Sequence, residues 1–454
     1  MTGDRQPAGV QRPAAPLPTH ADVNLTNACN LACAHCHASS GHKLPGELST
    51  DEFREAISAL HALGVLSVVV AGGEPFARRD VVEILAHACG LPGWQVAVVT
   101  NGIHLDRKAA ELAERCPNLD VNVSIDGSTA ERFATLRRQR GGAADPGWAF
   151  RGACDGARAS VEAGLRTSVN FTMTKPTIGD TRETYALATE ELGAASMVAI
   201  KFFPAGYGKD NLARLELPFQ KWSEEFAQLT LDKLTGELSR LQVSVPAPWE
   251  FYLPLIQADI DVAAAEASWG YRAPLREPLY AASASIGDVT GRREIALAPN
   301  GDVYPSVLTM GAPGAACGNL RRDPLERILS AGDPLAQLRA LELEALAGGC
   351  SDCGLAQVCG GGSRVRAWDR VGSWSAADGS CPLTSAAPGA PGARREPPEV
   401  AFPRRSAVLG SGPEAIRVFR FADRSELRFR GNVVRCDSRT TRLLDELLAA
   451  EEEA

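Results

Sequence analysis

Three cysteines stand close together near the start of the chain, in the stretch CNLACAHC, as Cys29, Cys33 and Cys36. Cysteines at such spacing on a polar loop are typical of metal ligands, because the loop offers no core in which to bury them. Structural zinc usually takes four protein ligands, whereas three thiolates can hold an iron–sulfur cluster with one iron left open. The spacing therefore favours an iron–sulfur cluster with a free coordination position over zinc or three buried thiols.

A second cysteine set lies towards the carboxyl end of the chain. Cys350, Cys353 and Cys359 stand in CSDCGLAQVCGGGSR, and Cys381 follows after 21 further residues. Four thiolates at this spacing predict a closed metal site, although spacing alone leaves zinc open as an alternative to an iron–sulfur cluster. Because four protein ligands leave no vacancy, the set predicts an electron-transfer or structural role.

Composition limits the class of protein and its partners. The chain has 454 residues, of which 45% are hydrophobic, and a formal net charge of −8. This length predicts two or three domains, and the acidic balance argues against nucleic acid or an anionic membrane surface as a partner. The sequence lacks a run of about 18 consecutive apolar residues, so we expect no membrane span. The proline-rich residues 1–20 are typical of a flexible tail rather than a signal peptide. We therefore expect a cytoplasmic protein whose cysteines do not form disulfides.

Residues 21–210 alternate short β-branched runs with helical patterns. Six strands are predicted in DVNLTN, VLSVVVAGGEP, WQVAVVTNG, LDVNVSIDG, RTSVNFTMT and SMVAIKFFPAG, with five helices between them, the first opened by Ser49 or Thr50. Near-continuous apolar strands of this kind predict an α/β fold with a parallel sheet. In a complete or partial β/α barrel, active groups gather at the carboxyl ends of strands. The cysteine loop and the segments GGEP, TNG, SIDG and NFT should therefore meet at one mouth.

The rest of the chain divides into four predicted parts. Residues 211–285 are expected to form a helical connection, and residues 286–385 a small cysteine-rich α+β domain that opens with a hairpin at Asn300–Gly301. Residues 386–409 are typical of a Pro/Gly/Ala linker. Residues 410–454 predict a small module of two strands and a helix.

The motif CNLACAHC after a first strand, with GGEP ending the second, resembles the radical S-adenosylmethionine (SAM) superfamily. The resemblance implies a partial, TIM-like (β/α)6 barrel in which the three cysteines of the first loop hold a 4Fe-4S cluster. The open iron would bind the amino and carboxylate groups of SAM, so the fourth ligand would be a substrate. Reductive cleavage of SAM would give a 5′-deoxyadenosyl radical that abstracts a hydrogen atom.

The resemblance also implies contacts to the methionine part of SAM. The backbone of Gly72, Gly73 and Glu74 would receive the methionine amino group, and Pro75 would fix the turn. A plain strand-to-helix turn is the alternative interpretation of these four residues.

Four further residues are candidates for the rest of SAM. Ser124 and Asp126 of SIDG match the place where relatives bind the ribose, with ordinary turn residues as the alternative. Asn170 is a ribose or carboxylate candidate at the end of the fifth strand. His35 stands where the family often has an aromatic residue near the adenine, and is otherwise a plain loop residue.

The second cysteine set resembles the SPASM extension of radical enzymes that modify peptides, and its twitch-like relatives that act on tetrapyrroles. Here the chain departs from the full pattern, because Ser363 and Ser306 stand where cysteines are expected. By family analogy both positions serve an inner auxiliary cluster, whereas the second cysteine set matches the outer one. The resemblance therefore implies two 4Fe-4S clusters in total, and Cys317 is left as a plain thiol, a remnant or an alternative ligand.

The resemblance implies a radical SAM enzyme with no catalytic group beyond the cluster, which receives electrons from a reducing partner such as flavodoxin or ferredoxin. A ribosomally made peptide is the favoured substrate, as in mycofactocin-type maturases, and residues 410–454 could then recognise a leader peptide or simply stabilise the chain. A tetrapyrrole side chain is the alternative substrate, because alternative heme pathways use enzymes with similar cysteine spacing. An iron–sulfur electron carrier without catalysis is the alternative of another class, and GGEP argues against it.

Overall fold

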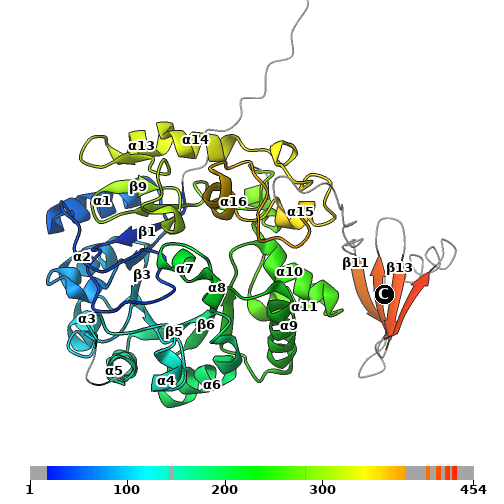
Figure 1. Ribbon diagram of the computed structural model, residues 1–454, viewed down its shortest axis with the longest axis horizontal. Coiled ribbons are helices and arrows are strands. Elements are labelled where there is room, and N and C mark those ends of the chain that lie inside the picture. The colour runs from blue at the N-terminus through cyan, green and yellow to red at the C-terminus, as the bar shows by residue number, and fades with distance from the viewer. Residues whose placement is uncertain are drawn as a thin grey trace, which may run out of the picture. The chain divides into compact units, whose positions relative to one another are not determined.

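The computed structural model describes residues 18–384, except 143, 144, 146 and 282, together with the backbone of four strands between residues 405 and 436. The chain divides into two compact units, one of residues 1–351 and 358–390 and the other of residues 352–357 and 391–454. The first unit contains the predicted barrel and most of the cysteine-rich region (Figure 1).

A ten-stranded sheet forms the centre of the first unit, in the order β10-β9-β8-β1-β2-β3-β4-β5-β6-β7. Neighbours from β8 to β7 pair in parallel, while β9 pairs antiparallel with β8 and β10 with β9. The strands are β1 His20–Asn24, β2 Ser67–Ala71, β3 Gln95–Thr100, β4 Leu119–Ser124, β5 Arg166–Met173, β6 Ser196–Lys201, β7 Leu241–Ser244, β8 Glu294–Leu297, β9 Asp302–Tyr304 and β10 Gly318–Asn319. The parallel run β1 to β6, in chain order, confirms the predicted α/β fold.

Helices alternate with the strands of this sheet. They are α1 Thr50–Ala62, α2 Val81–Cys89, α3 Ala109–Arg115, α4 Ala130–Phe133, α5 Trp148–Glu162, α6 Thr181–Ala186, α7 Tyr207–Asp210, α8 Leu212–Leu215, α9 Phe219–Thr235, α10 Pro248–Gln257, α11 Val262–Trp269, α12 Pro278–Ala281, α13 Leu325–Ala331, α14 Asp333–Ala340, α15 Ala356–Cys359 and α16 Arg364–Val371. The first begins at a capping box, in which Ser49 Oγ accepts from Glu52 N and Glu52 Oε2 accepts from Ser49 N. The cap predicted from the sequence is therefore Ser49.

The two faces of the sheet differ in character. On β5, Val169 and Phe171 are fully buried, whereas Asn170 and Thr172, which alternate with them, are half-buried. Successive side chains of a strand point to opposite faces, so the apolar residues share the face that packs under the helices. Because Asn170 pairs with Ser124 of β4 across the sheet, the other face carries small polar side chains. The opposite face of the parallel strands is thus available to line a polar site.

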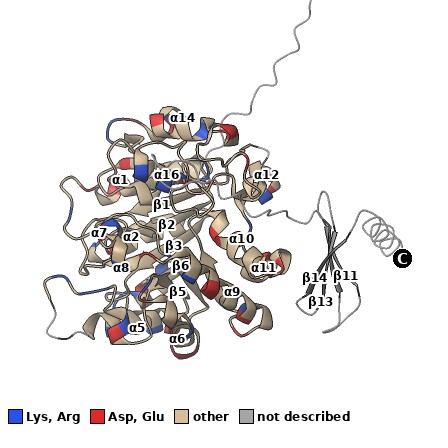
Figure 2. Ribbon diagram, turned by 45° about the vertical axis from the view of Figure 1, so that its right-hand side comes forward, with Lys and Arg blue, Asp and Glu red and all other residues tan. Residues whose placement is uncertain are grey.

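Charged residues gather on the helices and loops around the sheet, and the strands themselves are mostly uncharged (Figure 2). This distribution follows from burial, since charged side chains are costly away from water unless they are paired. Among the described residues, every helix is too short or too polar to cross a membrane.

The structure adds one strand to the middle of the chain, for which the sequence predicts a helical connection. Residues 211–285 contain α9, α10 and α11, but they also contain β7, which pairs in parallel with β6. The strand has only four residues, LQVS, and alternates in polarity, so its own sequence gives little signal without the neighbouring strand. The predicted hairpin is confirmed: Ala298 N donates to Asp302 O at 2.8 Å, and β8 and β9 flank the turn at Asn300–Gly301.

The described part of the second unit is a four-stranded antiparallel sheet, ordered β11-β12-β13-β14. Its strands are β11 Arg405–Leu409, β12 Ile416–Arg420, β13 Ser425–Phe429 and β14 Asn432–Cys436. The expectation of two strands beginning near residue 410 is therefore wrong, because these short strands mix charged with apolar residues and give a weak signal. The predicted helix, most of the linker and residues 1–17 lie outside the described residues.

We expect Gly156→Ala to lower the free energy of unfolding by about 1–3 kcal/mol, the usual cost of overpacking. Gly156 of α5 lies against the loop after β3, and a Cβ there would overlap the carbonyl oxygen of Gly102. Gly179→Ala is the matched control, because its Cβ would meet no atom within 4 Å. Denaturant unfolding of the two variants measures the difference, and equal stability would contradict this packing.

Candidate active site

The carboxyl ends of the parallel strands surround one cavity of about 230 Å³. Eight predicted site residues line it, from the cysteine loop and the ends of β2, β4 and β5: Cys29, Cys33, His35, Cys36, Gly72, Gly73, Ser124 and Asn170. The structure thus brings together segments that are up to 141 positions apart in the sequence, from Cys29 to Asn170. Glu74, Pro75 and Asp126 are predicted site residues that do not line this cavity.

The cysteine loop after β1 is held by backbone hydrogen bonds. Cys29 N donates to Gly41 O at 3.0 Å, which closes the two ends of the loop on each other. Backbone N–H groups also approach the sulfurs, from Leu31 to Cys29 Sγ at 3.4 Å and from Ser40 to Cys36 Sγ at 3.5 Å. N–H donors to sulfur stabilise thiolates and tune the potential of a cluster that they hold.

Burial makes the thiols of this loop weak acids. It raises the pKa of Cys29 to about 11 and that of Cys33 to about 12, while the Arg137 guanidinium acts in the opposite direction on both. Because metal ligands must be thiolates, a cluster bound here would displace these protons.

The GGEP turn after β2 lies directly against the cysteine loop. Gly73 N donates to Thr26 O at 2.6 Å, and Glu74 N donates to Ala28 O at 2.8 Å. Gly72 has φ +144°, and a Cβ there would lie 2.6 Å from Thr26 O, while a Cβ at Gly73 would overlap Ala28 O. Only glycine fits this close approach, so the two glycines are needed by the structure whatever else they bind.

The side chain of Glu74 is fully buried and points into the protein. Its carboxylate accepts hydrogen bonds from Thr100 Oγ1 at 2.7 Å, Asn101 N at 2.8 Å and Phe76 N at 3.0 Å. Burial raises its pKa, and these donors counteract that rise. Glu74 therefore ties the end of β2 to the end of β3, and Pro75 begins the short 3-10 turn that follows.

Asp126 lies behind the cavity wall and is fully buried. Its Oδ1 accepts from Thr172 N at 2.6 Å, and its Oδ2 accepts from Arg137 Nε at 2.6 Å and lies 3.3 Å from His35 Nε2. Burial alone would raise the pKa of Asp126, but Arg137 and His35 hold it below its ordinary range. The placement gives no support to a ribose contact for Asp126 and assigns it instead to positioning Arg137.

Arg137 also lines the cavity, and the sequence does not predict this. It belongs to the stretch RRQR, in which no sequence pattern separates an arginine that enters a site from one that faces solvent. Its guanidinium reaches Cys33 Sγ at 3.8 Å and His35 Nε2 at 3.4 Å. Burial lowers the pKa of His35 to about 4, so its imidazole is neutral near pH 7.

Three buried polar atoms around the cavity have no protein partner within the described residues: His35 Nδ1, His37 Nε2 and Ser40 Oγ. Together with three thiols and a glycine-lined wall, this donor set fits a thiolate-held cluster with a polar ligand beside it. In the described part of the chain, no three His, Cys, Asp or Glu side chains are grouped so that they could hold a single metal ion. A 4Fe-4S cluster meets each thiolate through a different iron, and its ligands surround a larger body than one ion.

The first unit also brings together three members of the second cysteine set. Cys359 interacts electrostatically with Cys381, and Cys350 interacts with both of them. Burial raises the pKa of Cys381 to about 12. Cys353 belongs to segment 352–357 of the second unit, so its place beside the others stays a prediction. Cys317 has Arg339 as its charged neighbour.

The two serines that replace expected cysteines are both buried caps. Ser363 Oγ accepts from Arg366 N at 3.4 Å at the start of α16, and Ser306 Oγ accepts from Leu308 N at 3.3 Å. Hydroxyl oxygen is a better acceptor than a thiol for such caps, so both positions have a structural use without a metal.

The sequence can now be compared with known families. Residues 23–188 match the pattern of the Radical SAM superfamily. These residues form a radical SAM domain. The matched range begins in β1 and ends just after α6, so it includes the first cysteine loop, the GGEP turn and the ends of β4 and β5. The chain thus carries a radical SAM domain, and proteins of this superfamily use a 4Fe-4S cluster and SAM.

Proteins similar to this chain have more than one function. The AdoMet-dependent heme synthase of Methanosarcina barkeri is 27% identical over 353 residues, which are 77% of this chain and 92% of that protein. The mycofactocin maturase MftC of Mycobacterium ulcerans is 35% identical over 190 residues, which are 41% of this chain and 48% of the maturase. Streptococcus suis SuiB, in a crystal structure with its precursor peptide SuiA, has a TM-score of 0.62 at 17% identity, covering 81% of this chain and 76% of SuiB. At that identity the likeness to SuiB shows a shared fold.

We expect Arg137→Met to lower the free energy of unfolding by about 3–5 kcal/mol, because it leaves Asp126 buried without its cation. Arg138→Met is the matched control on the adjacent residue, whose guanidinium makes an exposed bond to Ala134 O. Denaturant unfolding measures both variants. Similar losses in the two would contradict the role assigned to the Asp126–Arg137 pair.

Proposed function

We propose that this radical SAM enzyme binds SAM in the cavity and modifies a ribosomally synthesised peptide. The observation that carries the SAM site is the meeting of the three loop cysteines with the GGEP glycines around one cavity. Similarity to MftC, at 35% identity over 190 residues, supports the peptide substrate, and the shared fold with SuiB agrees with it.

The loop cysteines Cys29, Cys33 and Cys36 would hold the cluster, and the backbone of Gly72 and Gly73 would receive the methionine group of SAM. Once bound, these cofactors supply a 5′-deoxyadenosyl radical that abstracts a hydrogen atom from carbon.

The chain's own residues would orient the reactants and keep out water. Ser124 and Asn170 are paired across β4 and β5 and present polar groups on the cavity wall, which suits the hydroxyls of a ribose. Ile200, Phe202 and Leu308 line the cavity with apolar surface. An apolar wall excludes solvent and protects a reactive intermediate from side reactions.

The second cysteine set would hold an auxiliary 4Fe-4S cluster that has no vacancy for substrate. Its role would be electron transfer or structure, with flavodoxin or ferredoxin as the external reductant. The module at residues 410–454 would then be available to recognise a leader peptide.

A tetrapyrrole substrate is the second candidate. It is favoured by the similarity to the heme synthase of Methanosarcina barkeri, which extends over 92% of that enzyme, whereas the match to MftC spans 48% of the maturase.

After anaerobic reconstitution we expect about eight iron per chain, falling to about four in the Cys29/Cys33/Cys36→Ala variant. Iron and sulfide analysis measures both proteins, and release of 5′-deoxyadenosine on reduction should be lost in the variant. Four iron falling to zero would contradict an iron site at the second cysteine set. A parent that releases no 5′-deoxyadenosine would instead favour the electron-carrier interpretation.

The substrate class can be tested by parallel anaerobic assays of the holoenzyme with candidate precursor peptides and with Fe-coproporphyrin III. We expect a mass change in a peptide, together with 5′-deoxyadenosine formed above the substrate-free rate. A decrease in the mass of the porphyrin that corresponds to loss of a carboxyl group, with every peptide unchanged, would favour the tetrapyrrole candidate. The Cys29/Cys33/Cys36→Ala variant is the control for changes that do not depend on SAM.

A further inference from the structure

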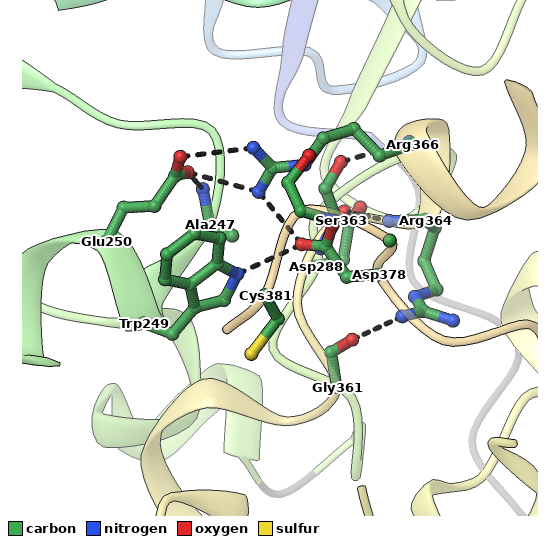
Figure 3. Close-up of polar contacts among 12 residues, drawn as sticks. Ala247, Trp249, Glu250, Asp288, Gly361, Ser363, Arg364, Arg366, Asp378 and Cys381 are labelled. Carbon is green, nitrogen blue, oxygen red and sulfur yellow. Dashed lines mark hydrogen bonds and ion pairs between the residues drawn. The ribbon is translucent and has the colours of Figure 1, made fainter. Parts of the chain in front are cut away.

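A buried series of alternating charges connects the barrel to the second cysteine set (Figure 3). Arg366, in the first turn of α16, donates to both oxygens of Glu250 on α10, at 3.0 and 3.1 Å. The same guanidinium donates to Asp378 Oδ2 at 2.8 Å. Glu250, Asp378 and Arg366 are 0, 1 and 6% exposed, so water screens these charges very little.

In the barrel, the series of charges begins at Lys201, the last residue of β6. Its Nζ donates to Glu250 Oε1 at 2.5 Å and lies 5.6 Å from the centre of the Trp222 ring. Lys201 pairs with the buried Met173 of β5, so its side chain shares the face that packs under the helices. The ammonium therefore holds Glu250, and Lys201 is also one of the residues that line the cavity.

At its other end, the series of charges reaches the loop that carries Cys381. Asp378 Oδ2 accepts from Ser363 N at 2.9 Å and from Trp249 Nε1 at 3.0 Å, in addition to Arg366. Ser380 N donates to Asp378 Oδ1 at 3.2 Å, and Cys381 N donates to the carbonyl oxygen of Asp378 at 3.0 Å. Asp378 is thus the residue through which the loop is anchored.

The geometry indicates more than general stabilisation. Two cations and two anions alternate, and each carboxylate has several donors, which is what buried ions require to offset their loss of hydration. The Arg366 guanidinium is hydrogen-bonded to the Asp378 carboxylate, and Asp378 interacts electrostatically with Cys359 and Cys381. Any cluster at these cysteines would experience both fixed charges.

We propose that Arg366 is a positioning residue for the second cysteine set, which fixes the Cys381 loop through Asp378 and sets the electrostatic potential at the cluster held there. Ser363, whose N–H donates to Asp378, stands where the family pattern places a ligand of an inner cluster. Arg366 and its carboxylates would thus connect the barrel to the auxiliary site without that cluster. This inference rests on the proposed auxiliary cluster and is independent of the substrate.

The charges predict shifts of opposite sign in the reduction potential of the auxiliary cluster. Asp378→Asn removes a negative charge next to the cysteines, so reduction becomes easier and the potential rises. Arg366→Gln removes the cation that is hydrogen-bonded to Asp378, so the potential falls. This single substitution leaves Glu250 paired with Lys201, and the glutamine keeps hydrogen-bonding groups in place. Asp378 keeps Ser363 N and Trp249 Nε1 as donors.

The experiment is a potentiometric titration of the reconstituted full-length enzyme, followed by electron paramagnetic resonance. The auxiliary signal is the one that added SAM does not change. We expect each variant to change the reduced-to-oxidised ratio at a fixed potential by about tenfold, in opposite directions, which is about 59 mV for a one-electron couple. The matched control is Lys209→Gln/Asp369→Asn, which removes a partly exposed ion pair at the same helix α16 and should leave the potential unchanged.

Opposite shifts with an unchanged control would support the proposal. Unchanged potentials in both variants, or shifts of the same sign as expected from general loosening, would overturn it while leaving the auxiliary cluster intact. If Asp378→Asn does not fold, a fall in potential in Arg366→Gln supports the proposal and an unchanged potential overturns it. A parent enzyme without a SAM-insensitive signal would overturn both the auxiliary cluster and this role of Arg366.

Discussion

The close approach of two loops determines how the active site is built. The backbone of Gly73 and Glu74 donates to the carbonyls of Thr26 and Ala28, at the start of the cysteine loop. A side chain at Gly72 or Gly73 would occupy the space of those carbonyls. The cysteine loop is therefore placed by the end of β2, and the glycines that would receive SAM also define where the cluster can stand. One contact thus sets the relative position of both cofactors.

The sheet supplies the rest of the site through the alternation of its strands. Apolar residues such as Val169 and Phe171 pack under the helices, which leaves Ser124, Asn170 and their neighbours on the other face. In a parallel β/α array the carboxyl ends of the strands lie at one edge, so loops distant in sequence converge there. Packing energy and site chemistry are therefore assigned to opposite faces of the same strands and do not compete.

Local signals made much of this predictable. The spacing of the loop cysteines, the GGEP turn and the apolar periods of the first six strands are each contained in a short stretch of sequence, and the structure places them as expected. Features that depend on distant partners were not predictable. The strand β7 exists because β6 offers it a free edge, and Arg137 acquires its place from Asp126 and Cys33, which no local pattern connects. The series of buried charges from Lys201 to Asp378, which the sequence did not predict, likewise joins four separate segments.

The two cysteine sets differ in what surrounds them, and this bears on their roles. The first set opens on a cavity lined by polar atoms that have no partner among the described residues, and Arg137, which contacts Cys33 Sγ, lies on the cavity wall. The described cysteines of the second set stand beside a buried chain of ions whose carboxylates are saturated with donors. A site that must exchange ligands needs open space and adaptable polar groups, whereas a site that only passes electrons benefits from a rigid environment that changes little with oxidation state. If the second set holds the proposed auxiliary cluster, the missing fourth cysteine of CNLACAHC and the four cysteines of the second set would follow from this difference between catalysis and electron transfer.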